Sequence, residues 1–475
     1  MKVLYVASES DPFIKTGGLA DVAASLPKAL KQQGVDIKVV IPLYSKIKDK
    51  YLDQLIKTHE FWVDLDWKHQ YAGVYEMDYE GVTYYFIDNE QYFRRKSIYG
   101  EFDDAERFIY FSKAAVLLPK QIKFKPDVIH SNDWHTGLVS AYVNEFKKGD
   151  DFYKDIKTLY TIHNLKYQGI FDPAVFSMTG LPGYLMNPDD LEFNQAINFM
   201  KGGIVQSNKF NTVSNTYSEE IRYPFFGEGL EGVINYHSNK LSGIVNGIDY
   251  DVWDPEKDDH LFENFGIETF KKRVVNKSKL QEKYGLPIRE DVMMISMVSR
   301  LTSMKGLELV RYIMDELLEE DIQLVILGTG DKEYEQMFKY FESKYPEKVA
   351  ARIYFDSDES HMIYGASDLF LMPSVAEPCG ISQLIAMRYG ALPLVRETGG
   401  LKDTVLPYNK YTKEGTGFSF ANINAHELLF KIKDAIDLYY ENRSDFDQLI
   451  VNAMESKNDW EKSSKAYIDL YRSMI

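Results

Sequence analysis

The stretch Val3-Leu4-Tyr5-Val6-Ala7, followed closely by Lys15-Thr16-Gly17-Gly18-Leu19-Ala20-Asp21, decides the fold. Five apolar residues in a row predict a buried strand, and the pattern from Asp21 to Lys31, stopped by Gly34, predicts a helix. A buried strand that passes through a glycine-containing loop into a helix begins a βαβ unit. Such units build parallel sheets, so the first 34 residues already indicate an α/β fold.

The same alternation of short β-branched runs and helical patterns continues along nearly the whole chain, in two series. The first series predicts strands at 3–7, 37–41, 83–87, 127–130, 158–162, 211–213 and 242–245. The second predicts strands at 293–298, 323–327, 352–355, 369–372 and 392–395, with helices such as 306–319 and 381–389 between them. The polar stretch 246–287 separates the series.

Two series predict two doubly wound domains with parallel sheets. We expect the first domain at 1–247 and the second at 248–456. Residues 457–475 then form a terminal helix, anchored by Trp460, Tyr467 and Tyr471. Ligands of open α/β sheets prefer the carboxyl ends of the strands, so we expect the site in a cleft between the domains.

Composition excludes several classes of protein. In 475 residues, 55 Lys plus Arg stand against 72 Asp plus Glu, and a net charge of −17 disfavours a nucleic-acid or anionic-membrane partner. The single cysteine, Cys379, cannot form an intrachain disulfide. No apolar run approaches the roughly 18 residues of a membrane span, and no signal peptide is recognisable. The sequence predicts a soluble, cytoplasmic protein.

The loop from Lys15 to Leu19 follows a strand and precedes a helix. Glycines there let backbone amides approach a phosphate, with the lysine as counter-charge, although a plain turn with a solvated lysine has the same pattern. The usual nucleotide motifs are absent. The dipeptide Gly-Lys does not occur, which excludes a P-loop, and no third glycine completes a Rossmann fingerprint after Gly328-Thr329-Gly330.

The second series carries two further phosphate-binding candidates. Arg300 and Lys305 follow a strand and could converge on a diphosphate as leaving-group charge develops, or they could be two surface cations. Glu377, within Ser374 to Gln383, lies between a strand and a helix N-terminus. The amides there could hold phosphate oxygens, although a capping carboxylate explains the same pattern.

Polar residues also follow strands of the first series, in Asn132-Asp133-Trp134-His135 and Thr161-Ile162-His163-Asn164. At strand ends such groups can form hydrogen bonds with substrate hydroxyls or take part in catalysis, whereas a lone histidine is more often structural. No metal-ligand spacing and no serine-nucleophile motif is present. Phosphate-binding parts together with hydroxyl-reading groups indicate transfer of a sugar from a nucleotide.

These segments, in this order, resemble the bacterial glycogen synthases and plant starch synthases, the ADP-glucose-dependent α-1,4-glucan synthases. The resemblance covers essentially the entire chain. It is carried by 15–21, 132–138, 161–165, 167–169, 245–249, 299–302, 305–306, 377–380, 386–390 and 398–401.

The resemblance implies a GT-B fold, in which two Rossmann-like domains face each other across a deep cleft. The first domain is the acceptor side, the second binds the nucleotide sugar, and the terminal helix packs back on the first. It further implies a retaining glycosyltransferase of glycogen biosynthesis that moves glucose from ADP-glucose to the non-reducing 4-OH of a growing α-glucan and releases ADP. The expected partners are ADP-glucose and glycogen, without nucleic acid, membrane, metal or other cofactor. A homo-oligomer is left open.

The resemblance also assigns roles to residues. The catalytic set is Glu377, Arg300, Lys305, His163 and Asp133, in which the two cations neutralise departing ADP. The substrate-binding set, for ADP-glucose and glucan, is Lys15, Gly18, Tyr99, Asn164, Asn246, Phe355, Cys379, Gly380 and Ile381. Within these sets Lys15 and Gly18 meet phosphates or the forming product, whereas His163, Asn164, Asn246 and Asp133 read glucose hydroxyls.

Two questions stay open at this point. Retention could proceed by double displacement through Glu377 or Asp133, or by a same-face reaction in which the leaving phosphate accepts the proton; we favour the second. The chain also departs from the family, with Val375-Ala376 for Arg-Phe, Met304 for glutamine and Phe355 for tyrosine. A catalytically weakened glucan-binding or regulatory homologue, or a retaining glucosyltransferase that uses UDP-glucose, are therefore the alternatives.

Overall fold

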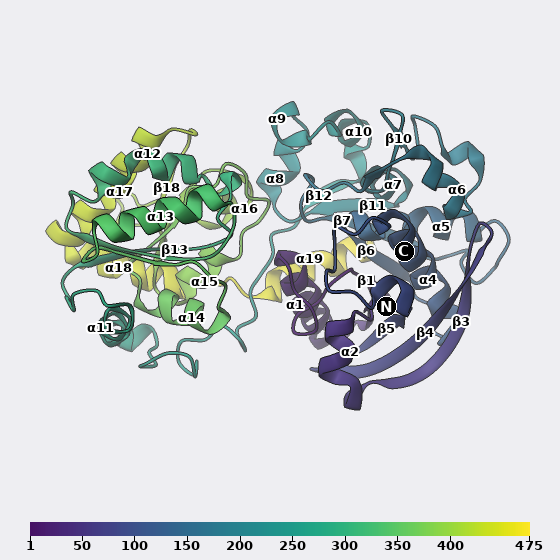
Figure 1. The fold of residues 1–475 in the computed structure, drawn as a ribbon, viewed down its shortest axis with the longest axis horizontal. Coiled ribbons are helices and arrows are strands. Elements are labelled where there is room, and N and C mark those ends of the chain that lie inside the picture. The colour runs from purple at the N-terminus through teal and green to yellow at the C-terminus, as the bar shows by residue number, and fades with distance from the viewer. The chain divides into compact units, whose positions relative to one another are not determined.

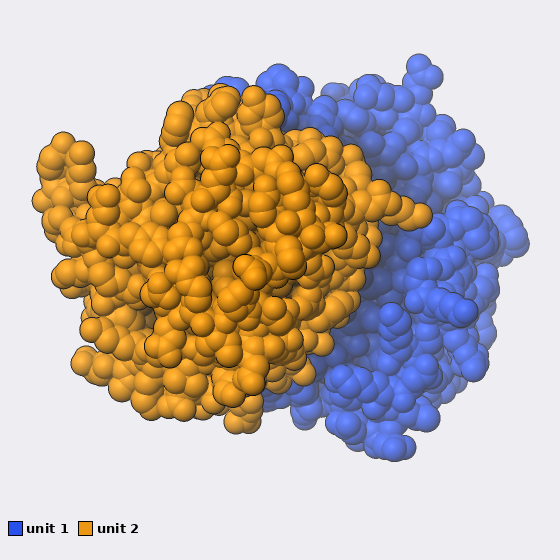
Figure 2. All heavy atoms as spheres, turned by 60° about the vertical axis from the view of Figure 1, so that its left-hand side comes forward, with its two compact units in different colours: residues 1–246, 460–475 blue, residues 247–459 orange.

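The structure is a computed structural model that describes all 475 residues. The chain divides into two compact units, coloured separately in Figure 2. Unit 1 comprises residues 1–246 and 460–475, and unit 2 comprises residues 247–459. No helix combines the length and the apolar character that crossing a membrane requires.

Unit 1 is built on a nine-stranded mixed sheet (Figure 1). In spatial order its strands are β12 (Leu241–Gly243), β11 (Lys209–Thr212), β7 (Lys157–Ile162), β6 (Val128–Asn132), β1 (Lys2–Val6), β2 (Asp36–Pro42), β5 (Val82–Asp88), β4 (Lys68–Tyr79) and β3 (Ile56–Leu65). The first seven pair in parallel. Helices cover the parallel strands, so Val3 to Val6 in β1 are completely buried.

The two strands β3 and β4 form a long antiparallel ribbon at one edge of this sheet, which the sequence analysis did not predict. In the second half of β3, Phe61, Val63 and Leu65 are buried, while Trp62 and Asp64 between them are exposed. Only one face of the ribbon is covered, so its hydrophobic pattern alternates instead of running continuously. A search for continuous apolar runs therefore passes over it.

The helices of unit 1 fall mainly between successive parallel strands. They are α1 (Gly18–Gln32), α2 (Ser45–Tyr51), α3 (Glu90–Phe93), α4 (Asp104–Gln121), α5 (Val139–Phe146), α6 (Phe176–Thr179), α7 (Phe199–Gln206), α8 (Asn215–Glu220), α9 (Pro224–Gly227) and α10 (Glu231–Tyr236). A small second sheet pairs β8 (Ile170–Phe171), β10 (Ala196–Asn198) and β9 (Glu192–Phe193).

The last helix of the chain, α19 (Trp460–Arg472), belongs to unit 1 and packs against α1 (Figure 1). Two of its own side chains, Tyr467 and Tyr471, are fully buried. The Tyr471 hydroxyl lies 2.7 Å from Nδ1 of buried His130, and the Tyr467 hydroxyl accepts a hydrogen bond from Asn211 at 3.0 Å. Apolar burial and specific polar contacts therefore both fix this helix to the strands of unit 1.

Unit 2 contains a six-stranded sheet that is parallel throughout. In spatial order its strands are β15 (Val349–Arg352), β14 (Ile322–Leu327), β13 (Met293–Val298), β16 (Leu369–Met372), β17 (Leu392–Arg396) and β18 (Phe418–Phe420). Its helices are α11 (Arg273–Tyr284), α12 (Leu307–Leu317), α13 (Lys332–Lys344), α14 (Ser357–Ala366), α15 (Ser382–Arg388), α16 (Gly399–Thr404), α17 (Ala425–Glu441) and α18 (Arg443–Glu455).

One predicted strand of unit 2 was misplaced. The sequence favoured residues 352–355, but β15 spans Val349–Arg352 and Phe355 lies in the following loop. Val349, Ala350 and Ala351 pair with β14 and are buried, whereas Tyr354 and Phe355 are exposed. The aromatic residues gave the later segment a stronger strand pattern than the small residues that pair in the sheet.

Both sheets reverse their strand order beside the first strand of the unit. The reversal lies between β1 and β6 in unit 1 and between β13 and β16 in unit 2. At such a switch point the loops that follow the two neighbouring strands diverge to opposite faces, which opens a crevice at the carboxyl ends of the strands. The fold therefore places a candidate binding position in each unit.

Candidate active site

In unit 2 an ion pair lies at the switch point. Lys305 ends a 3₁₀ turn, Ser303–Lys305, that follows β13, and Glu377 lies in the loop after β16. The Lys305 Nζ is 2.6 Å from Oε2 of Glu377, and the Ser374 hydroxyl donates to the same oxygen at 3.0 Å. Both charged side chains are mostly buried. The pairing of β13 with β16 brings these two residues together although 72 positions separate them.

Two glycines allow the backbone to pack closely around this pair. Gly306 has φ +72°, and a Cβ atom there would lie 1.9 Å from the carbonyl oxygen of Pro373. Gly399 has φ +45°, and its Cβ would lie 1.9 Å from the carbonyl oxygen of Glu377. Any other residue at either position would displace the loop that carries Glu377.

The loop before Glu377 is held by an arginine that the sequence analysis did not single out. Arg396, at the end of β17, donates from Nε to the Ser374 carbonyl at 2.8 Å and from Nη2 to the Val375 carbonyl at 2.5 Å. The Val375 amide in turn donates to the Met304 carbonyl at 2.8 Å. These bonds use the backbone of residue 375, so the family's arginine is not required there to hold the loop. An arginine that ends a buried strand was the available signal.

The remaining predicted residues of unit 2 lie at the same edge of the sheet. Arg300 follows β13, and its side chain is exposed and makes no ion pair or hydrogen bond. Phe355 follows β15 and is 80% exposed, which leaves its ring face open. Cys379 is buried, Gly380 has φ +75°, and Ile381 is the N-cap of α15.

In unit 1 Lys15, in the loop after β1, forms two ion pairs. The Lys15 Nζ is 2.5 Å from Oδ1 of Asp21 and 3.5 Å from Oδ2 of Asp11; Gly18 begins α1 next to it. Burial opposes the charge of Lys15, yet Asp21 and Asp11 raise its pKa. Glu9, which the sequence analysis did not select, is buried and accepts the Thr16 amide and hydroxyl at 2.7 Å each.

Burial raises the pKa of Glu9 to about 7, although the bonds from Thr16 work in the opposite direction. This carboxyl group, in the loop that follows β1, therefore titrates near neutral pH. An acidic residue two positions after the buried run Val3–Ala7 was the signal in the sequence. Perturbed carboxyl groups of this kind are concentrated at functional sites.

Asp133 and His163 are brought together at the ends of β6 and β7. Asp133 has φ +54°, and its Oδ1 accepts the His163 amide at 2.7 Å. Desolvation raises the pKa of Asp133 to about 7, while the amides of His163 and Asn164 oppose the shift. Desolvation lowers the pKa of His163 to about 3, so its imidazole is neutral at physiological pH.

The tautomer of His163 follows from its contact with Asn132. The Asn132 Nδ2 donates to the Val6 carbonyl, which fixes the orientation of the amide, and its Oδ1 accepts from the Tyr5 hydroxyl. The His163 Nε2, at 2.9 Å from the same oxygen, must therefore carry the proton. Nδ1 is left as a hydrogen-bond acceptor.

The other predicted residues of unit 1 lie in loops around the same switch point. The Tyr99 hydroxyl is 2.7 Å from the Ser8 hydroxyl, and its ring centroid is 4.3 Å from that of His135. The Asn164 side chain accepts from the Lys166 amide at 3.0 Å. Asn246 follows β12 and is buried, and its Oδ1 has no hydrogen-bond partner.

Two doubly wound units, each with charged or polar side chains at its switch point, are the architecture of the GT-B glycosyltransferases. Residues 2–236 match the family described as "Starch synthase catalytic domain", and residues 278–450 match "Glycosyl transferases group 1". The chain belongs to the glycogen and starch synthase family, and it is an enzyme that builds glucan by transferring glucose.

The similarity extends over complete chains. A glycogen synthase of Finegoldia magna is 56% identical over 476 residues, and one of Clostridioides difficile is 50% identical over 479 residues, with 100% of both chains covered in each case. Among solved structures, the catalytic domain of starch synthase IV from Arabidopsis thaliana, bound to ADP and acarbose, superposes with a TM-score of 0.92. That domain is 32% identical, and 99% of each chain is covered.

Proposed function

We propose that this enzyme transfers glucose from ADP-glucose, with retention of configuration, to the non-reducing 4-OH of an α-1,4-glucan such as glycogen and releases ADP. The observation that carries the proposal is the Lys305–Glu377 ion pair beside the unpaired Arg300 at the switch point of unit 2. The glycogen synthase relatives support the acceptor, and the ADP bound to the Arabidopsis domain supports the nucleotide.

Arg300 and Lys305 have the chemistry that a departing nucleoside diphosphate needs. Negative charge on the diphosphate grows as its bond to glucose breaks, and fixed cations stabilise that charge more than they stabilise the bound substrate. Arg300 has no partner in the protein to compete with a phosphate, whereas Lys305 is held in place by Glu377. With two cations in this role, we expect the reaction to need no metal ion.

The loop amides around Glu377 extend this arrangement. Glu377 shares one oxygen with Lys305 and Ser374, which leaves its second oxygen for a glucose hydroxyl. The backbone of Cys379, Gly380 and Ile381 leads into α15, where the free amides of a helix N-terminus favour negative charge. Phe355 offers an exposed ring face on which the adenine could stack.

Unit 1 supplies acceptors for sugar hydroxyls. The neutral His163 presents Nδ1, and the buried Asn246 presents an Oδ1 that lacks a partner. A hydroxyl donating to either atom would satisfy a group that is costly to leave unpaired. We assign Asp133, Asn164 and Tyr99 to the same hydroxyl-reading set, and Lys15 with Gly18 to the phosphate or the forming product.

The contacts favour a same-face reaction. A double displacement requires an ionised carboxylate as nucleophile. With a pKa of about 7, Asp133 is ionised in only about half of the molecules at neutral pH. Glu377 is already bound to Lys305, which suits a positioning role. The leaving phosphate then accepts the proton of the attacking 4-OH, while Arg300 and Lys305 bind that phosphate.

The test is release of ADP from ADP-glucose in the presence of glycogen, with UDP-glucose in parallel. We expect ADP release, a clear preference for ADP-glucose, and loss of turnover in Glu377→Gln. Glycogen binding without nucleotide release would instead support a weakened glucan-binding homologue. Preference for UDP-glucose would overturn the donor assignment. The cytoplasmic location stays a prediction from the sequence, which leaves a homo-oligomer open.

A further inference from the structure

A pocket of about 290 Å³ lies in unit 2, away from the switch point. Its walls come from the turn Ile267–Lys272, from α11 and α18, and from the residues that precede β13 and β16. It therefore lies at the amino ends of these parallel strands, whereas Arg300 and Glu377 lie beyond their carboxyl ends. The pocket is separate from the candidate active site.

Four cations line this pocket, namely Lys271, Arg273, Lys277 and Arg443, together with the acids Glu290, Asp368 and Asp447. Two of the acids are already used. Lys277 Nζ is 2.6 Å from Asp368 and also bonds to the carbonyls of Glu290 and Val292. Asp447 accepts Arg443 Nε at 2.8 Å and lies 3.9 Å from Lys271 Nζ.

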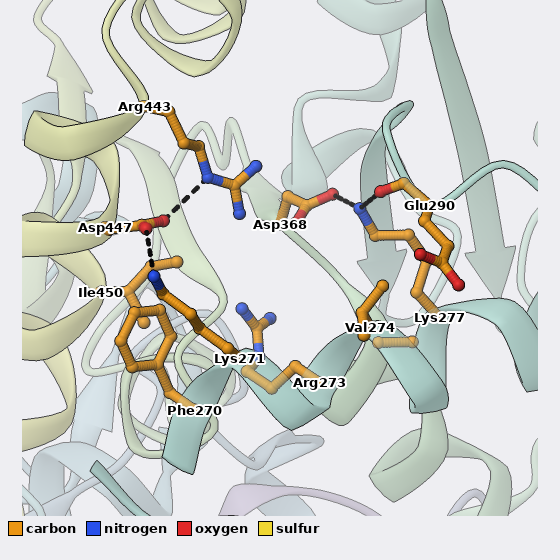
Figure 3. A pocket seen from close by; sticks show the side chains of 11 residues that line it. Phe270, Lys271, Arg273, Val274, Lys277, Glu290, Asp368, Arg443, Asp447 and Ile450 are labelled. Atoms are coloured by element: carbon orange, nitrogen blue, oxygen red, sulfur yellow. Dashed lines mark hydrogen bonds and ion pairs between the residues drawn. The ribbon is translucent and has the colours of Figure 1, made fainter. Parts of the chain in front are cut away.

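Arg273 is the cation without an acidic partner. The residue is only 6% exposed. Its side chain forms no ion pair, and its Nε has no hydrogen-bond partner. One terminal nitrogen donates to the Ser367 carbonyl. Figure 3 shows the guanidinium group of Arg273 in the open space between the two ion pairs, below that of Arg443.

Burial and a neighbouring cation both act against the charge of Arg273. Burial lowers the pKa of Arg273 to about 10, Asp368 acts in the opposite direction, and the charge of Arg443 lowers the pKa further. Two guanidinium groups thus repel each other across a pocket, and one of them is desolvated. An anion between them would supply the hydrogen-bond acceptors that Arg273 lacks and remove this repulsion.

We propose that this pocket binds a phosphate group, either as inorganic phosphate or as the end of a small phosphate ester. Two arginines offer the planar, forked donors that match phosphate oxygens. The volume is at the lower end of the range for small-molecule sites and exceeds the needs of a bare phosphate. Phe270, Val274 and Ile450 add an apolar wall for a short carbon skeleton.

Calorimetric titration of inorganic phosphate, and separately of glycerol phosphate, tests the proposal at constant ionic strength. Arg443→Gln is the main variant, because its side chain is half exposed and its loss leaves the buried Arg273 in place. Lys272→Gln is the matched control, since Lys272 is adjacent in sequence but pairs with Glu263 outside the pocket. Lys305→Gln reports on phosphate bound at the candidate active site.

We expect phosphate binding that is retained in Lys272→Gln and Lys305→Gln and weakened by about ten-fold or more in Arg443→Gln, as loss of one charge-assisted contact implies. Tighter binding of glycerol phosphate would identify an ester as the occupant, and equal binding would identify free phosphate. Absence of binding by both compounds overturns the proposal. So does binding that Lys305→Gln abolishes and Arg443→Gln leaves unchanged, because the phosphate then occupies the active site.

Discussion

Replacement of Gly399 by alanine tests whether the position of Glu377 controls catalysis. The added Cβ would lie 1.9 Å from the Glu377 carbonyl oxygen, and real Cβ atoms essentially never approach closer than 3.0 Å. The carbonyl must therefore retreat by about 1 Å, and a displacement of that size can cost about 100-fold in rate. The Gly400 amide, which donates to the carbonyls of Glu377 and Pro378, would carry the disturbance along the loop.

Gly285→Ala is the matched control. Gly285 also has a positive φ, +74°, but a Cβ there meets nothing within 4 Å. Both variants should lose about 1 kcal/mol of stability from the left-handed backbone. Only Gly399→Ala should also lose about 100-fold in kcat, measured as ADP release from ADP-glucose with glycogen. If Gly399→Ala unfolds at the temperature of Gly285→Ala and turns over at the same rate, the exact placement of Glu377 is not what limits the reaction.

Three further predictions follow from single contacts. Lys305→Gln should lower kcat by about 100-fold, because it removes one cation from the leaving group and leaves Glu377 unpaired; unchanged ADP release would contradict this role. The stability of Asp133→Asn relative to the parent should rise by about 4 kcal/mol as the pH increases from about 4 to about 8, measured in denaturant titrations. In the folded parent Asp133 keeps its proton up to a pKa of about 7, whereas the unfolded chain releases it near the ordinary pKa of an aspartate. The parent therefore loses stability as the pH rises through this window. A stability difference between variant and parent that does not change with pH would refute the burial argument. Tyr471→Phe should lose about 1 to 2 kcal/mol of stability, because it leaves Nδ1 of buried His130 unpaired while Nε2 keeps its contact with Thr161. A fall in ADP release by a fully folded variant would show that α19 does more than pack.

The parallel strands could be predicted because burial on both faces gives a recognisable apolar run. Met293–Val298 and Leu369–Met372 were located to the residue for this reason. The ribbon of β3 and β4 was missed because one of its faces is exposed, and β15 was misplaced because its small residues resemble a loop more than a strand. Hydrophobic pattern therefore predicts strands that are buried on both faces, and it misses a strand such as β3 that has one exposed face.

The candidate site was predictable in its residue types but not in its contacts. Lys305 and Glu377 were selected separately, as strand-end residues, and their 2.6 Å contact depends on β13 lying beside β16. Arg396 was not selected because it donates to the backbone carbonyls of Ser374 and Val375. Every residue has a backbone carbonyl, so no residue type in the sequence marks such a contact. Glu9 was passed over because its raised pKa arises from burial by residues distant in the chain.

A crystal structure of the enzyme with ADP bound tests the central claim most directly. The account predicts that the diphosphate lies against unit 2 within hydrogen-bond distance of both Arg300 and Lys305, and that Lys305 keeps its contact with Glu377. A diphosphate that touches neither cation, or ADP that binds elsewhere on the chain, would contradict it.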